Sequence, residues 1–161
     1  MSSQLIIAST FLLAMILSVV SLPQLIPIEV AYVRPEWITL VLIYWVIALP
    51  NRIGMRTAWV VGILTDVLLG TLLGQHALIY MLVAYISYTL YQRLRMMPIW
   101  QQSLFVFVII LLSQILNFWA VRITGVVEWT SWYFLPSVIS SLMWPWIFMS
   151  LRLVRRRFNI I

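Results

Sequence analysis

A single acidic residue, Asp66, lies within a long apolar stretch, and its chemistry needs an explanation. It is the only charged residue between positions 57 and 92. A carboxylate near the middle of a bilayer costs about 2.5–3.5 kcal/mol. The group must therefore be neutral, paired, or turned toward a cavity or another helix. Small residues recur every four positions around it, which predicts a helix face that another backbone can approach closely. This face comprises Ala58, Gly62, Asp66, Gly70 and Gly74.

Two interpretations of this small-residue face stay open. It is either a seam within the chain, with Asp66 hydrogen-bonded inside it, or a docking groove or proton or substrate site. We favour the seam, because transporters usually carry several ionisable groups in the membrane. The candidate hydrogen-bond partners for Asp66 are Gln114, Asn117, Ser140 and Ser141. We expect His76 at the membrane interface with no catalytic role.

Most enzyme classes are disfavoured by the residues that the chain lacks. It has no cysteine and one histidine, so thiolate sites and multi-histidine metal sites are excluded. Intramembrane proteolysis needs a serine–histidine pair or two aspartates, but the chain has one aspartate and one histidine expected at the membrane interface. Phosphoryl transfer needs acidic residues that hold a metal ion or a glycine-rich phosphate loop, and the sequence shows neither. We expect no catalytic residue, no metal and no cofactor.

The composition indicates which elements must position these residues. Hydrophobic residues make up 64% of the 161 positions and charged residues 9%, against about 25% charged in a soluble domain. The sequence predicts an all-α polytopic membrane bundle, one domain over residues 1–161. Its six transmembrane helices are expected at about 4–22, 36–49, 57–73, 76–92, 102–121 and 132–151. The second, between Pro35 and Pro50, is short for a full span.

Arginine placement predicts the orientation. With both termini in the cytoplasm, eight of ten arginines lie inside, and only Arg34 and Arg122 lie outside. If the short second segment were re-entrant, only the N-terminus would change sides. The net charge of +6 then reflects topology and anionic lipid rather than nucleic acid. The predicted lipid-facing arginines are Arg152, Arg155, Arg156 and Arg157.

The last predicted helix contains Pro136 and Pro145, the second beside Trp144. Proline frees a carbonyl and bends a membrane helix. Such bends shape a transporter site or a groove for a neighbouring protein, and the sequence leaves both open.

Several ordered motifs resemble the rod shape-determining protein MreD family of Gram-negative type. They are Arg34-Pro35-x-Trp37, Tyr44-Trp45, Ala48-Leu49-Pro50-x-Arg52, the Gly62 to Gly74 spacing, Trp100-Gln101-Gln102, and Trp144-Pro145-Trp146-Ile147-Phe148. The resemblance covers about residues 34–157; before that it amounts only to a hydrophobic helix.

The resemblance implies a non-enzymatic protein of the bacterial inner membrane that supports peptidoglycan synthesis and rod shape. It implies direct binding of MreC, and a complex with MreB, RodA and the elongation penicillin-binding transpeptidase. It also implies a fold similar to the substrate-binding subunits of energy-coupling-factor transporters.

On this basis we expect a scaffold whose groove, between the small-residue face and the bent last helix, holds the membrane helix of MreC. The outer segment with Arg34, Pro35, Glu36 and Trp37 is expected to set the angle at which MreC leaves the membrane. The alternatives are a small-molecule binding or transport subunit with a cavity near Asp66, and a homo-oligomer formed through the small-residue face.

Overall fold

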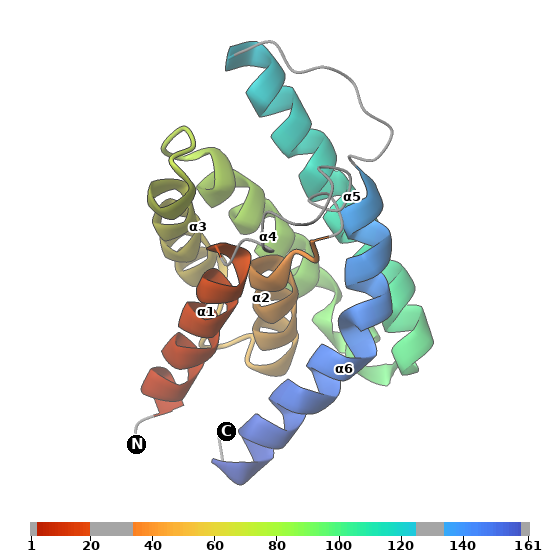
Figure 1. The fold of residues 1–161 in the computed structure, drawn as a ribbon. Coiled ribbons are helices and arrows are strands. Elements are labelled where there is room, and N and C mark those ends of the chain that lie inside the picture. Colours follow the sequence, from red (N-terminus) through yellow and green to blue (C-terminus); the bar gives the residue numbers. More distant parts are fainter. Residues whose placement is uncertain (1–2, 20–33, 125–133, 159–161) are drawn as a thin grey trace, which may run out of the picture.

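The computed structural model describes residues 3–19, 34–124 and 134–158, and these residues form six helices and no strand. The predicted all-α architecture with six helices in order is confirmed. Figure 1 shows that α1 begins and α6 ends at the same end of the bundle. The helices are α1 Ser3–Val19, α2 Trp37–Ala48, α3 Met55–Leu69, α4 Gln75–Met96, α5 Ile99–Thr124 and α6 Leu135–Arg157.

The end of α3 differs from the predicted end near residue 73. This helix ends at Leu69 because Gly70 adopts a left-handed conformation with φ of 65°, and Gly74 has φ of 99°. Glycine adopts such angles without steric cost. The expectation that Gly70 and Gly74 continue the small-residue face of a helix is therefore wrong, because both lie in the α3–α4 loop. Residues 20–22 and 132–133, predicted to be helical, lie outside the described residues.

The short α2 is the central helix of the bundle. Every residue from Ile38 to Ala48 is buried, and α2 contacts α1, α4, α5 and α6. A helix that is apolar on all faces is stable where other helices surround it. At 12 residues α2 is about 18 Å long, shorter than the hydrocarbon core of about 30 Å. Its ends therefore lie within reach of side chains from its neighbours.

The helices α3 and α4 form a closely packed hairpin. A Cβ atom on Gly62 would lie 2.3 Å from the Cα of Ala77, and Ala58 and Ala77 are both fully buried. Only glycine permits this approach of two backbones. The part of the small-residue face on α3 is thus covered by the chain's own next helix.

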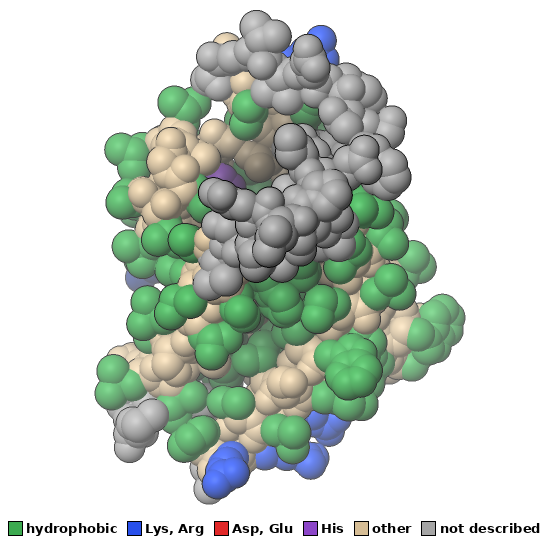
Figure 2. Space-filling model, viewed as in Figure 1, with side chains coloured by type: hydrophobic (Ala, Val, Ile, Leu, Met, Phe, Trp, Pro, Cys, Tyr) green, Lys and Arg blue, Asp and Glu red, His purple; other side chains and the backbone are tan. Residues whose placement is uncertain are grey.

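The outer surface of the bundle is largely apolar, as hydrophobic side chains over most of the visible face in Figure 2 show. Leu142 on α6 is 70% exposed and Val67 on α3 is 66% exposed. Soluble proteins rarely expose such large apolar surfaces. Within residues 3–19, 34–124 and 134–158, two helices are long and apolar enough to cross a membrane, Ile99–Ile123 and Leu135–Arg157.

The two prolines of α6 have different roles. Pro136 lies in the first turn, where its missing N–H is not needed, so the expectation that it bends the helix is wrong. Pro145 lies inside α6, and the helix changes direction about halfway along its length in Figure 1. The loss of one backbone hydrogen bond at Pro145 accounts for this bend.

The α3–α4 contact predicts that Gly62→Ala destabilises the protein, because the added methyl group meets backbone atoms that cannot rotate away. Overpacking of this kind costs about 1–3 kcal/mol. We expect a melting temperature several degrees below that of wild type in detergent, measured by size-exclusion chromatography after heating. Gly54→Ala is the matched control, since nothing lies within 4 Å of its Cβ position. Equal melting temperatures for the two variants would contradict the assigned contact.

Candidate functional site

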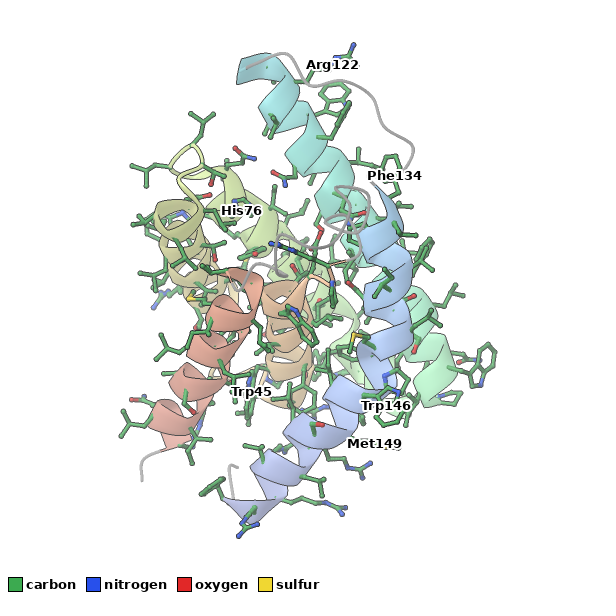
Figure 3. The ribbon with its side chains drawn as sticks, viewed as in Figure 1. Trp45, His76, Arg122, Phe134, Trp146 and Met149 are labelled. Atoms are coloured by element: carbon green, nitrogen blue, oxygen red, sulfur yellow. The ribbon has the colours of Figure 1, made fainter. Side chains whose placement is uncertain are left out.

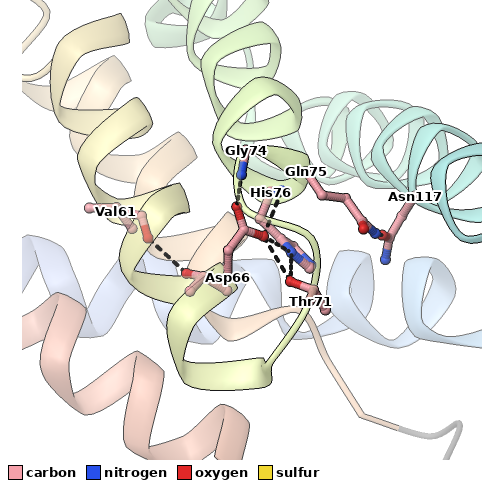
Figure 4. A network of polar contacts seen from close by, with 8 residues as sticks. Val61, Asp66, Thr71, Gly74, Gln75, His76 and Asn117 are labelled. Carbon is pink, nitrogen blue, oxygen red and sulfur yellow. Dashed lines mark hydrogen bonds and ion pairs between the residues drawn. The ribbon is translucent and has the colours of Figure 1, made fainter. Parts of the chain in front are cut away.

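The Asp66 carboxylate binds the loop and helix that follow it, as Figure 4 shows. Oδ1 accepts hydrogen bonds from the Thr71 hydroxyl at 2.8 Å and from the His76 backbone N–H at 2.9 Å. The His76 Nδ1 atom lies 2.8 Å from the same oxygen. Oδ2 accepts a hydrogen bond from the Gly74 N–H at 2.9 Å. Asp66 is fully buried, and every one of these partners lies within ten residues of it.

This geometry makes Asp66 the anchor of the α3–α4 turn. Two of its partners are backbone N–H groups at the N-terminus of α4. This end of the helix carries partial positive charge, and its first N–H groups have no acceptor within the helix. Two left-handed glycines let the loop curl back so that these groups reach the carboxylate. The structure thus places Asp66 inside the chain's own seam, in the last turn of α3.

The hydrogen-bond partners expected for Asp66 from the sequence are not those found. Gln114, Ser140 and Ser141 do not contact it, and Asn117 accepts a hydrogen bond from Gln75 instead. The true partners are local, and His76 is among them. The sequence signal for this contact is a histidine ten residues after an aspartate, with two glycines between them that allow the chain to turn back.

A cavity of about 270 Å³ lies beside this turn, and residues from all six described helices line it. All four residues of the predicted outer segment, Arg34 to Trp37, line it, and so does His76. The segment therefore faces inward in part. The remaining lining residues are Leu17, Ser18, Ile38, Thr65, Leu69, Ile79, Tyr80, Ser113, Gln114, Asn117 and Pro136.

Glu36 brings a second carboxylate into the bundle at the start of α2. Its Oε2 atom accepts a hydrogen bond from the Thr39 hydroxyl at 2.8 Å and lies 3.2 Å from the Ser113 hydroxyl. Its backbone N–H donates to the Ser140 hydroxyl on α6 at 2.9 Å. Glu36 thus links α2 with α5 and α6. Its place in the predicted outer segment did not indicate this role.

Two polar atoms at the cavity have no hydrogen-bond partner. They are Gln114 Oε1 and Arg34 Nε. The Gln114 side chain is on α5, and the residue is only 5% exposed. Buried polar atoms are almost always satisfied, so these two mark the cavity as more than a packing defect.

The opposite end of the bundle gathers arginines. Arg52, Arg95 and Arg155 line one cavity, and Arg95, Arg152 and Arg155 line an adjoining one. Arg122 lies at the other end of the molecule (Figure 3). Arg156 and Arg157 follow in the last turn of α6. One end of the molecule is therefore strongly basic, as the arginine distribution predicted.

Arg95 has a structural role that the sequence did not reveal. Its guanidinium donates to the Ile47 carbonyl at 2.9 Å and to the Ala48 carbonyl at 2.7 Å. These carbonyls end α2 and have no partners within that helix. Arg95 therefore closes the C-terminus of the central helix.

The aromatic motifs meet between α2, α5 and α6. The Trp144 indole N–H donates to Gln102 Oε1 at 3.3 Å, and the rings of Tyr44 and Phe148 lie 5.6 Å apart, edge to face. Trp144 is fully buried, whereas Trp146 is 75% exposed. Trp144 and Pro145 thus belong to a different part of the bundle from Asp66.

In the described part of the chain, no group of three or more histidine, aspartate or glutamate side chains could hold a metal ion.

The Asp66 network predicts a graded loss of stability. Asp66→Ala leaves two buried N–H groups unpaired, Asp66→Asn removes the charge and one acceptor, and Thr71→Val removes one hydrogen bond. Hydrogen bonds to charged groups are worth about 1.5–3 kcal/mol each. We expect the melting temperature in detergent to fall most for Asp66→Ala and least for Thr71→Val. Three equal melting temperatures would show that the carboxylate does not anchor the turn.

The Arg95 contacts predict that Arg95→Gln destabilises the protein more than Arg93→Gln. Both changes remove one positive charge from the last turn of α4, but it is Arg95 that donates hydrogen bonds to the α2 carbonyls. We expect a difference of about 1–3 kcal/mol in unfolding free energy, measured by denaturant titration in mixed micelles. A larger effect for Arg93→Gln would refute the assigned role.

Comparison with known proteins identifies the family. Residues 2–154 match the family model of the rod shape-determining protein MreD, so the match includes the first helix, where the motifs had indicated no specific likeness. The chain is 36% identical over 138 residues to the rod shape-determining protein MreD of Haemophilus influenzae, covering 83% of each chain. No solved structure matches the chain. The chain belongs to the MreD family of rod shape-determining membrane proteins.

Proposed function

We propose that the chain is a non-enzymatic scaffold of the bacterial inner membrane that supports peptidoglycan synthesis and rod shape by binding MreC. The observation that carries this proposal is the family match over nearly the whole chain. The structure supports it because two carboxylates, the buried Asp66 and the half-buried Glu36, hold helix ends and link helices.

The surface that we assign to MreC is a row of exposed apolar side chains along α6, which we call the α6 row. Its members are Val138, Leu142, Trp146, Met149 and Leu153. Their spacing of three or four residues places them on one face, and Figure 3 shows Trp146 and Met149 pointing away from the bundle. A single membrane helix fits such a face along its whole length.

The family motif Trp144-Pro145-Trp146 supports this choice. Trp144 is fully buried and packs in the core, but Trp146 is 75% exposed and contributes nothing to that packing. The bend at Pro145 lies between the upper and lower halves of the row. The Gly62 position is covered by α4, so it does not line a docking groove.

The remaining partners follow from the same proposal. MreC would connect the scaffold with MreB filaments, RodA and the elongation penicillin-binding transpeptidase. Six membrane crossings with both termini in the cytoplasm would place the basic end beside anionic lipid headgroups, where Arg152, Arg155, Arg156 and Arg157 hold the protein. Homo-oligomerisation through the α6 row is the competing use of this surface.

The proposal is tested by the double variant Leu142→Ala/Trp146→Ala, measured by co-purification with MreC in mild detergent. Tryptophan is enriched among interface hot spots, whose truncation costs about 2 kcal/mol or more, so we expect at least about a tenfold loss of bound MreC. Trp100→Ala/Leu104→Ala on α5 is the matched control, since it removes the same two side chains at the same spacing from an equally exposed face.

Equal retention of MreC by both variants would reject the α6 row. Crosslinks that join two copies through this row, with MreC unaffected, would favour the homo-oligomer instead. A rod-shaped cell that keeps its shape after depletion of the protein would reject the scaffold function itself.

A further inference from the structure

The cavity beside the Asp66 turn has the features of a binding site that the scaffold function does not require. Its volume is about 270 Å³, far more than a single buried water molecule needs. Its wall combines apolar side chains with a few polar groups from different helices. Small-molecule sites in proteins have this composition.

One acceptor in the wall lacks a donor, and a carboxylate lies beside it. Gln114 is 5% exposed and its Oε1 atom has no hydrogen-bond partner. The Glu36 carboxylate contacts the hydroxyl groups of Thr39 and Ser113 and interacts with the Gln114 side chain. No arginine nitrogen in the described residues lies within 4 Å of it. A carboxylate away from water is favourable only with a charged partner or full hydrogen bonding. A ligand with a cationic N–H group would supply the missing donor to Gln114 Oε1 and a charged partner for Glu36.

The wall also offers an unpaired donor. Arg34 lines the same cavity, and its Nε atom is buried without a partner. A guanidinium prefers a carboxylate or phosphate oxygen as its partner. The unpaired atoms that line the cavity are therefore an acceptor, Gln114 Oε1, and a cationic donor, Arg34 Nε. The Glu36 carboxylate adds negative charge to the same wall.

We propose that this cavity binds a small zwitterion that carries a primary ammonium and a phosphate group. The ammonium contacts Glu36 and Gln114, and the phosphate contacts Arg34. This chemistry belongs both to free phosphoethanolamine and to the headgroup of phosphatidylethanolamine. Binding would satisfy the polar atoms that the chain leaves unpaired, and it does not depend on MreC.

The test compares melting temperatures of the purified full-length protein with two probes. One arm adds phosphoethanolamine in detergent, and the other compares nanodiscs of phosphatidylethanolamine with nanodiscs of phosphatidylcholine, whose quaternary ammonium has no N–H donor. A ligand at about 100 times its dissociation constant shifts the folding equilibrium about 100-fold, which we expect to raise the melting temperature by about 5 °C. Stabilisation in the first arm identifies a free metabolite, and stabilisation in the second arm alone identifies a lipid headgroup.

Two variants make the test specific. Glu36→Gln keeps the size of the side chain and an acceptor for Thr39, and Gln114→Leu removes the unpaired oxygen. Both should abolish the ligand-dependent rise in melting temperature. Ser87→Ala is the control, because Ser87 also carries a buried oxygen without a partner but does not line the cavity, and its ligand response should equal that of wild type.

No stabilisation by either probe would overturn the proposal. An equal rise in melting temperature in wild type and Glu36→Gln would also overturn it, since the probe would then bind elsewhere. Variants that fail to fold are recognised from their own melting curves without ligand. In that case Arg34→Gln, which changes the other end of the site, decides: an undiminished response rejects the proposal and a lost response supports it.

Discussion

The structure depends on the need to satisfy every backbone polar group where no water is present. In a bilayer an unpaired N–H or carbonyl costs several kcal/mol. Helices satisfy their own interior groups, but their ends do not. In this protein the ends of α2 and α4 are closed by side chains: Arg95 at the C-terminus of α2, Ser140 beside its N-terminus, and Asp66 at the N-terminus of α4. Gln102 closes the C-terminus of α4 through the Leu94 and Met97 carbonyls.

This constraint explains how a chain with so few charged residues uses them. The central helix is too short to cross the hydrocarbon core alone, so both its ends are held within the bundle by residues from α4 and α6. The α3–α4 turn is held by a carboxylate and two left-handed glycines. Asp66 and His76, which are polar groups of the kind found in reaction sites, instead hold the α3–α4 turn together. Glu36, Gln114 and Arg34 differ, because they line a cavity in which polar atoms lack partners.

Much of the fold could be predicted from the sequence, since apolar length and arginine placement follow directly from the thickness and charge of a membrane. The six helices and the basic end were predicted in this way. The Asp66 partners were not, because a four-residue glycine spacing reads as a helix face, whereas Gly70 and Gly74 adopt left-handed conformations. The role of Arg95 was missed because periodicity does not show which carbonyls an arginine reaches. The inward position of Glu36 depends on packing against α5 and α6, which no local pattern encodes.

The helix-end contacts tie the helices of this MreD family member to one another inside the bundle, while many apolar side chains face outward. The central claim is that the helix ends are satisfied inside the bundle. Hydrogen–deuterium exchange of the native protein in nanodiscs tests it directly at the backbone amides of Gly74 and His76. We predict exchange at least about 100-fold slower than in an unstructured peptide, because both amides donate to a buried carboxylate. Exchange at the rate of an unstructured peptide would contradict the account.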